Sequence, residues 1–152
     1  MRKIFIIFLL MTFYTRAFAD TDVSEDAIKA AFIFHFISFT EWSDTQQDYY
    51  VCIPDDEVLR ETSREIFKDK LINNHKIVVS EKSEGCHVLV SDNVPSTNTT
   101  MTIGPLVNGA LFEFRLIDNK MKFAVNLGKA KRFKFKISSQ LLKLAILEDD
   151  PK

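Results

Sequence analysis

Glycine is scarce in this chain of 152 residues. It has four glycines, and none precedes Gly85. The turn Pro54-Asp55-Asp56, which follows the first predicted strand, is therefore acidic and free of glycine. A phosphate-binding loop needs glycines, because they let backbone N–H groups approach the anion closely. We therefore do not expect the chain to bind a nucleotide through such a loop.

Recognisable catalytic motifs are also lacking. The sequence contains no G-x-S-x-G, no H-E-x-x-H and no P-loop, so the sites that these motifs form are not predicted. Its three histidines, His35, His75 and His87, are far apart in the sequence. His35 lies among the apolar positions of a predicted helix, where a hydrogen-bonded core histidine is commoner than a catalytic one. We predict that the protein is not an enzyme and has no cofactor.

An excess of positive charge is missing as well. The chain carries 20 Lys and Arg against 21 Asp and Glu, whereas proteins that bind nucleic acids present basic surfaces. We expect no nucleic-acid partner.

The first 19 residues have the three parts of a secretory signal peptide. Arg2 and Lys3 supply positive charge, an apolar run follows over 4–14, and Ala17-Phe18-Ala19 provides a small-residue cleavage site. An uncleaved membrane anchor is the alternative, but a run of about 11 residues is shorter than the roughly 20 that span a bilayer. We predict cleavage after residue 19 and a soluble product, residues 20–152, outside the cytoplasm.

Cysteine occurs only twice, at Cys52 and Cys86. With His75 and His87 these residues offer the donors of a zinc site, but neither cysteine belongs to a C-x-x-C pair, so the ligand spacing is weak. Both lie in predicted strands of an exported chain, and exported proteins meet an oxidising compartment. We therefore predict a disulfide between Cys52 and Cys86 that is mainly structural.

A second candidate for metal binding is the acidic run Asp55, Asp56 and Glu57, since Ca²⁺ and Mg²⁺ prefer carboxylate oxygens. An exposed acidic turn that caps the following helix is the commoner outcome of such a run. We predict a helix cap here and no metal site.

The segment from Asp26 to Trp42 is apolar nearly all round. At 100° per residue, one side carries the spacing of a helix packed on a core, at Ile28, Ala31, Phe32, His35, Phe36 and Phe39. The opposite side carries Ala30, Ile33, Phe34 and Ile37. A surface helix needs one apolar face, so the second is covered either by the chain itself or by another protein. We assign Ile33, Phe34 and Ile37 to an interface, formed with a second copy or with a partner.

The remaining elements alternate between strands and helices. We expect strands at 49–53, 76–79, 86–90, 101–103, 110–116 and 121–125, and further helices at 57–71 and 138–148. Strand, helix and strand from 49 to 79 form a βαβ unit with parallel strands, and the last two strands form a hairpin. The pattern predicts an α/β fold, a single-domain sandwich with a mixed sheet of about five to six strands flanked by helices on both faces.

Cations are concentrated near the C-terminus, interleaved with two phenylalanines. They are Lys129, Lys131, Arg132, Lys134 and Lys136. The commoner interpretation is a solvated face, and the alternative is a site for an anionic ligand or an acidic partner surface. The candidate contacts for a ligand or partner are Lys131, Arg132 and Lys134, with Glu41 and Trp42 at the end of the first helix.

Four blocks, in this order after a signal peptide, resemble the YfiR-like periplasmic proteins. The blocks are 29–32 with 36–42, Cys86-His87-Val88-Leu89 with the earlier Cys52, Phe123-Ala124-Val125-Asn126, and 137–145. The resemblance covers almost all of residues 20–152.

This resemblance implies a periplasmic α/β sandwich that is usually a homodimer. It also implies that the protein represses an inner-membrane diguanylate cyclase by contacting the periplasmic sensor domain of that enzyme, which would control cyclic-di-GMP, biofilm formation and motility. The alternative is a periplasmic small-ligand sensor acting on another membrane receptor, favoured by Trp42, Tyr49 and Tyr50 and by the cations of 129–136.

Overall fold

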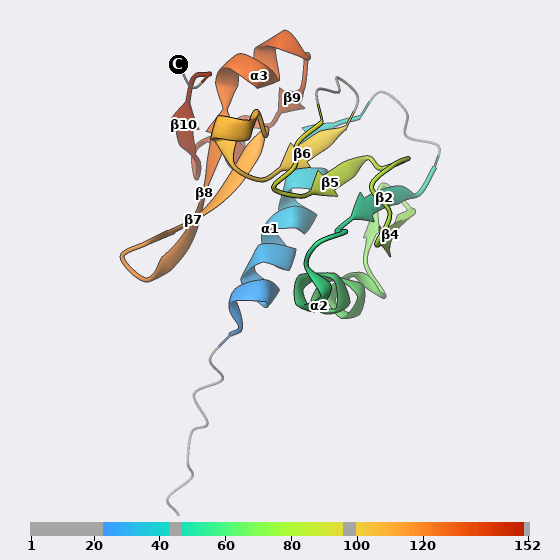
Figure 1. The fold of residues 1–152 in the computed structure, drawn as a ribbon. Helices are drawn as coiled ribbons and strands as arrows, with labels where there is room; N and C mark the ends of the chain where they lie inside the picture. Colours follow the sequence, from blue (N-terminus) through green and yellow to red (C-terminus); the bar gives the residue numbers. More distant parts are fainter. Residues whose placement is uncertain (1–22, 43–46, 96–99, 151–152) are drawn as a thin grey trace, which may run out of the picture.

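Helix α1 (Glu25–Ser38) lies between the two halves of the sheet in the computed structural model, which describes residues 23–42, 47–95 and 100–150 (Figure 1). Its start is fixed by Ser24, whose Oγ accepts a hydrogen bond from the Ala27 N–H at 3.2 Å. Glu25 and Asp26 add negative charge to the first turn, where the helix dipole favours it. The predicted helix is therefore confirmed. The predicted signal peptide lies outside the described residues.

The main sheet has eight strands in the order β10-β8-β7-β6-β5-β2-β4-β3. In that order they are Ile146–Glu148, Lys120–Asn126, Phe112–Ile117, Met101–Ile103, Val88–Val90, Tyr49–Cys52, His75–Ser80 and Leu71–Ile72. The β7–β8 and β3–β4 pairs are antiparallel and the others are parallel. The α/β class and the mixed sheet are confirmed. The sheet has more strands than predicted, because short strands at 71–72 and 146–148 extend it at both edges.

The βαβ unit is formed by β2, helix α2 (Glu57–Phe67) and β4, with Tyr50 opposite Val78. The chain then passes to the other side of β2 and forms β5, which is parallel to it. Cys52 ends β2 and Cys86 precedes β5, so the two residues meet. They form the predicted disulfide, with Cα atoms 5.9 Å apart, which rules out a zinc site built on free thiolates.

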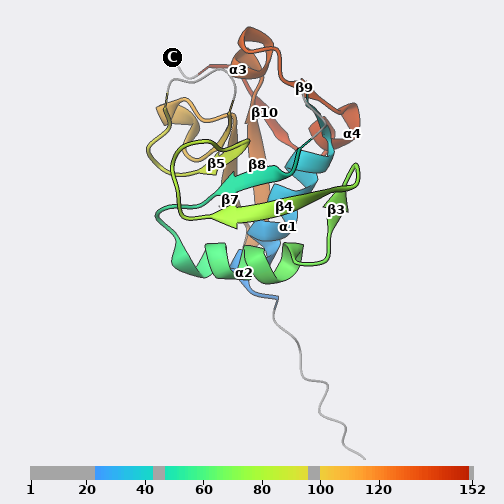
Figure 2. The same cartoon turned by 90° about the vertical axis from the view of Figure 1, so that its right-hand side faces the viewer.

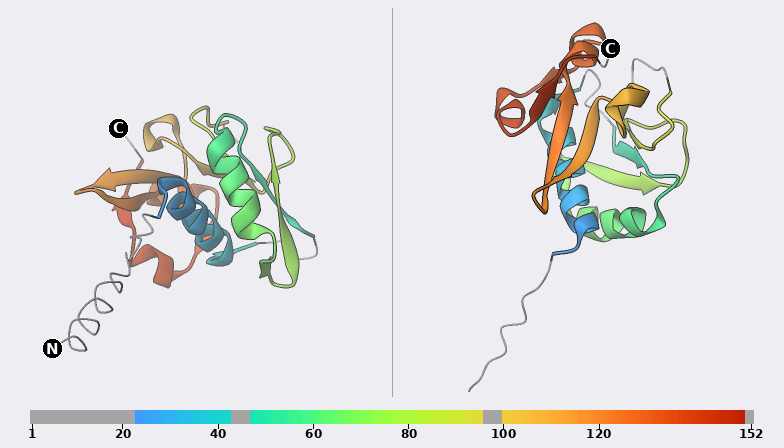
Figure 3. Two further views of the ribbon diagram at one scale, coloured as in Figure 1. Left: turned by 90° about the horizontal axis from the view of Figure 1, so that it is seen from below. Right: turned by 60° about the vertical axis from the view of Figure 1, so that its left-hand side comes forward.

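Both long helices lie on the same face of the sheet. α1 and α2 run side by side (Figure 3), and the rings of Phe34 and Phe67 are 6.3 Å apart. On its other side, α1 packs on the hairpin, where the Phe36 ring stacks on Phe112 with centroids 4.1 Å apart. Figure 2 shows α2 in front of α1 and below β4. Helices were predicted on both faces of the sheet, whereas the two long helices share one face.

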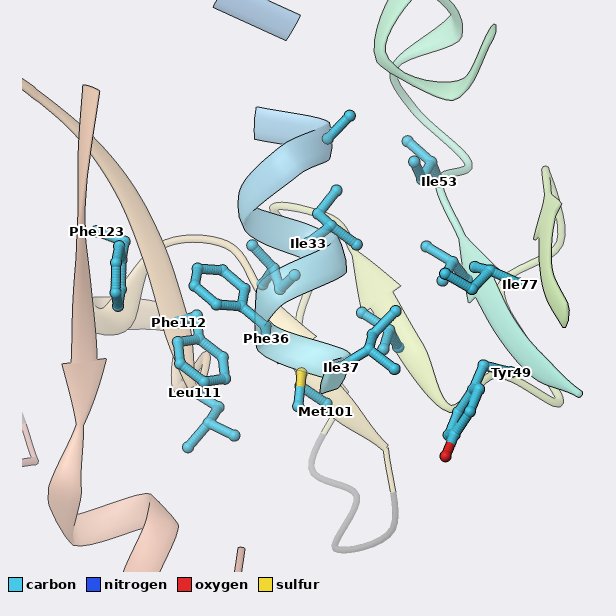
Figure 4. Close-up of a cluster of buried hydrophobic side chains, with 14 of the residues drawn as sticks. Ile33, Phe36, Ile37, Tyr49, Ile53, Ile77, Met101, Leu111, Phe112 and Phe123 are labelled. Atoms are coloured by element: carbon cyan, nitrogen blue, oxygen red, sulfur yellow. The ribbon is translucent and has the colours of Figure 1, made fainter. Parts of the chain in front are cut away.

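The side chains of α1 that were assigned to an interface are buried or half-buried within the chain, which corrects that assignment. Ile33 and Ile37 are 0% exposed within the single chain, and Figure 4 shows them among core residues that include Ile77 and Met101. Phe34 is half-buried and lies against α2, with the Lys70 ammonium 5.0 Å from its ring. These residues are inside the core because α2 covers the side of α1 that the hairpin leaves free.

Beyond the exposed first residue Glu25, the exposed line of α1 is narrow and consists of Ala31, His35 and Ser38. Ala31 and His35 were predicted to face the core, so this part of the prediction is also wrong. Helical periodicity could not show which of the two apolar sides is exposed, because the exposed side carries small or amphipathic residues rather than charged ones.

The predicted C-terminal helix is much shorter in the structure. α4 (Ser139–Leu142) is one turn long, and residues 146–148 form β10, parallel to β8. Strand pairing prevails here because Arg115 on β7 binds Glu148 through two hydrogen bonds of 2.5 and 3.1 Å. The Arg115 guanidinium also holds the pKa of the Glu148 carboxyl below its usual value.

The burial of Ile33 can be tested by truncation. Ile33→Ala should lower the free energy of unfolding by about 2 to 5 kcal/mol, because it leaves a cavity in the core. Ala31→Lys, at an exposed position of the same helix, should change it by less than about 0.5 kcal/mol. Urea denaturation of both variants measures this. A stable Ile33→Ala protein that fails to self-associate would instead support the interface.

Candidate functional site

A cleft of about 620 Å³ opens where the parallel strands β2, β5 and β6 end. The chain leaves β2 towards α2 and β4, whereas β5 and β6 lie on the opposite side of β2. The loops after these strands therefore diverge, and such a switch point is a usual place for a binding crevice in an α/β sheet. The first turns of α1 and α2 and the β7–β8 hairpin form its walls.

The apolar part of the cleft comes mainly from five elements, helix α2 and strands β5, β6, β7 and β8. Its side chains include Leu59, Val90, Ile103, Phe114, Leu116 and Met121. Leu59 and Ile103 belong to the core, whereas Leu116 near the hairpin tip is 61% exposed. An exposed leucine beside a cleft offers apolar surface that a bound molecule would cover.

The charged part of the cleft is strongly acidic. Its carboxylates belong to Glu25, Asp55, Asp56, Glu57, Asp92 and Glu113. Among the described residues that line the cleft, Lys29 is the one cation, and its ammonium is already paired with Glu25 at 2.7 Å. Carboxylates gathered along one opening concentrate cations there.

The acids at the start of α2 have structural partners. Asp56 Oδ1 accepts the Leu59 N–H at 2.9 Å, and Asp55 Oδ2 accepts the Ser91 hydroxyl at 2.9 Å. The predicted helix cap is therefore confirmed. Within the described ranges, no group of three His, Cys, Asp or Glu side chains is placed to hold a metal ion.

One edge of β7 is open beside the cleft. β6 pairs with β7 only at Ile103 and Phe112, and the Gly104 N–H donates to the Phe112 carbonyl at 2.9 Å. Backbone groups of a strand point to the same side at every second residue. Those of Phe114 and Leu116 therefore point to the same side as Phe112, beyond the end of β6. Both residues line the cleft.

The predicted contacts Glu41 and Trp42 lie at the opposite end of α1. Glu41 belongs to β1 (Thr40–Glu41), which pairs with β9 (Lys136–Ile137), and its carboxylate lies 3.0 Å from Lys136 Nζ. The Trp42 indole N–H donates to the Ile37 carbonyl at 2.9 Å, and its ring contacts Tyr49 and His87. A helix of this length separates these residues from the cleft by about 20 Å.

Helix α3 (Leu127–Arg132) contains the first three cations of the basic stretch, and Lys134 and Lys136 follow the helix. Lys131, Arg132 and Lys134 are exposed, and Arg132 forms an ion pair with Asp150. Among the described residues, no hydrogen bond, ion pair or ring contact joins these three cations to Trp42. The structure therefore does not bring the predicted contacts into one site.

Lys129 departs from the prediction of a solvated face. It is 5% exposed, and its ammonium donates to Thr102 Oγ1 at 3.0 Å and to the Gly109 carbonyl. Burial, together with the charge of Arg132, lowers the pKa of Lys129. The side chain turns inward because Asn126 Oδ1 caps α3 by accepting the Lys129 N–H at 2.7 Å, which fixes its position above β6.

A second exposed surface lies on the sheet face opposite α1 and α2. Tyr50 is 40% exposed, and its cross-strand partner Val78 is also exposed. The His87 ring stacks on Tyr50 with centroids 5.9 Å apart and planes 13° from parallel. We call Tyr50, Val78 and His87 the aromatic patch.

Comparison with known families places the chain in one of them. The model of the YfiR/HmsC-like family matches residues 26–146. The chain belongs to the YfiR/HmsC-like family. The match begins in α1 and ends at the first residue of β10, so it includes the whole cleft wall from Asp55 to Met121. No curated protein matches this YfiR/HmsC-like chain. In the described part of the chain, no helix combines the length and hydrophobicity that crossing a membrane requires.

The buried Lys129 predicts a specific pH dependence. Because the folded state binds the Lys129 proton less tightly than the unfolded chain does, burying the charged ammonium costs stability at neutral pH. That cost falls as the pH rises through the folded pKa towards the ordinary value of about 10.4. The unfolding free energy of the wild type should therefore rise relative to Lys129→Met between neutral and alkaline pH.

Urea denaturation at a series of pH values measures the difference. Lys131→Met, which removes an exposed lysine of the same helix, is the matched control. Parallel curves for the wild type and Lys129→Met would contradict the prediction.

Proposed function

We propose that this protein is a periplasmic regulator that binds the periplasmic sensor domain of an inner-membrane diguanylate cyclase and represses the enzyme. The observation that carries this proposal is the match to the YfiR/HmsC-like family over residues 26–146. That family is regulatory rather than catalytic. Repression would lower cyclic-di-GMP and, with it, biofilm formation.

Repression by contact requires an accessible surface, and the aromatic patch supports this role. The side of α1 first assigned to an interface is buried, whereas Tyr50 and Val78 are exposed on adjacent strands. Tyrosine is enriched at protein interfaces because its ring buries a large area and its hydroxyl stays hydrogen-bonded. The patch is also rigid, since the disulfide joins Cys52 to Cys86, the residue before His87.

Hydrogen bonds between Tyr50 and His87 also hold the aromatic patch in place. The Tyr50 N–H donates to His87 Nδ1 at 3.0 Å, and the His87 N–H donates to the Tyr50 carbonyl at 2.9 Å. Two hydrogen bonds between these residues hold their rings in one orientation. A surface that is already ordered loses little conformational entropy when a partner covers it.

Site-specific crosslinking tests the proposal directly. A photoreactive phenylalanine analogue replaces Tyr50, the protein is exported in its own host, and irradiated adducts are identified by mass spectrometry. We expect an adduct with the periplasmic domain of a membrane diguanylate cyclase. The same analogue at Leu144, which is exposed elsewhere, should give no such adduct. Recovery of no cyclase at Tyr50 would contradict the proposal.

A charge in the aromatic patch should abolish repression. Val78→Glu places a carboxylate where a partner would have to bury it unpaired, so cyclic-di-GMP should rise to the level of a deletion strain. Leu144→Glu adds the same charge at another exposed leucine and should behave as wild type. Size-exclusion chromatography of both variants shows whether the patch also serves a homodimer. Normal repression by a folded Val78→Glu protein would refute this role.

A further inference from the structure

We infer that the cleft at the ends of β2, β5 and β6 binds an extended segment of another protein that carries basic and apolar side chains, and that this segment pairs with the open edge of β7. The aromatic patch plays no part in this inference, since none of its residues lines the cleft. The inference therefore adds a second binding surface to the proposed function.

The backbone of β7 supplies the first reason. β8 pairs with β7 along all six of its residues, from Phe112 to Ile117, whereas β6 pairs with Phe112 alone. The N–H and C=O groups of Phe114 and Leu116 are thus directed at the cleft rather than at a strand. An exposed strand edge is a ready template for an added strand, and many domains bind peptides in this way.

The side chains of the cleft supply the second reason. A strand added to β7 would place alternate side chains against Phe114, Leu116 and Met121, which form the hairpin wall. Leu116 is largely exposed in the isolated chain. Apolar side chains of the incoming segment would cover Leu116, and removing this apolar surface from water would stabilise the complex.

Charge selects the kind of segment. Among the described residues, six carboxylates line the cleft against one lysine; Glu25 is paired with that lysine and Glu113 with Arg115, which leaves Asp55, Asp56, Glu57 and Asp92 without an ion pair. The starts of both helices are already occupied by acids of the chain itself, Asp56 on α2 and Glu25 on α1. An anionic ligand would meet repulsion here, and lysine or arginine side chains would meet attraction.

A second copy of this chain fits the cleft poorly. Pairing of two β7 edges about a two-fold axis would bring two acidic clefts together, and like charges across an interface oppose association. The occupant is therefore a different protein with a cationic and apolar extended stretch.

Peptide binding to the purified exported protein tests this inference. The probe is a short, blocked, fluorescent peptide of alternating lysine and valine, and fluorescence anisotropy gives its Kd. The matched peptide of alternating glutamate and valine should bind at least about tenfold more weakly, a difference of about 1.4 kcal/mol. Equal binding of the two peptides would overturn the charge argument.

A second pair of peptides isolates backbone pairing. Lysine–valine peptides that are N-methylated at alternate residues, in either register, keep their charge but lose the N–H donors of one edge. At least one register should bind about tenfold more weakly than the parent peptide. If neither register weakens binding, the segment does not pair with β7 and the inference fails.

Substitutions locate the site. Leu116→Lys places a cation in the cleft and should weaken binding of the lysine–valine peptide about tenfold. Val107→Lys, at an exposed valine of the short helix Leu106–Asn108 outside the cleft, should change Kd less than about twofold. If Leu116→Lys does not fold, Glu57→Gln removes one exposed carboxylate instead and should weaken binding about twofold to fivefold.

The outcome is independent of the cyclase. Val78→Glu should bind the peptide as the wild type does, because Val78 is not among the cleft residues. Wild-type affinity in Leu116→Lys or in folded Glu57→Gln would overturn the location. No measurable binding of the lysine–valine peptide to the wild type would overturn the whole inference, and repression of the cyclase would be unaffected.

Discussion

The burial of α1 is the constraint on which the rest of the structure depends. This helix is apolar on nearly every side, so a single flat sheet could not cover it. Two other elements cover it: Phe36 packs against Phe112 on the hairpin, and Phe34 packs against Phe67 on α2. The sheet therefore has to pass around the helix, with the hairpin on one side and the β2–β4 unit on the other (Figure 1). The fourteen residues of α1 thereby contact both sides of a sheet that β5 and β6 keep continuous.

Both candidate surfaces follow from this arrangement. β6 has three residues and β7 has six, so the sheet separates beyond Phe112 while the hairpin projects outward beside α1 (Figure 3). The separation leaves the cleft and the open edge of β7. Because α1 and α2 both occupy one face, Tyr50 and Val78 on the opposite face of β2 and β4 stay exposed in the described part of the chain. One arrangement of helices thus explains a crevice on one side and an exposed aromatic surface on the other.

Local patterns in the sequence were enough to predict α1, the βαβ unit, the hairpin and the disulfide. Each depends on neighbouring residues or on strands adjacent in the sheet, such as the cap at Ser24 or the pairing of β2 with β5. The features that were missed depend on distant contacts. Residues 146–148 form a strand because β8 and Arg115 are beside them, and Lys129 is buried because Thr102 and Gly109 accept its hydrogen bonds. Sequence spacing contains none of this information.

The cleft was missed for a related reason. Asp55, Asp56 and Glu57 were visible as an acidic run, but Glu25 and Glu113 join them only through the fold. β2 connects this cleft to the aromatic patch, since Tyr50 lies within the strand and Asp55 follows its end. The disulfide at Cys52 lies between the two and ties the end of β2 to the start of β5. Because no residue of the patch lines the cleft, a partner on the patch and a segment in the cleft do not compete for the same side chains. If the patch and the cleft bind as proposed, the disulfide-tied strand between them holds the two partners at a fixed separation.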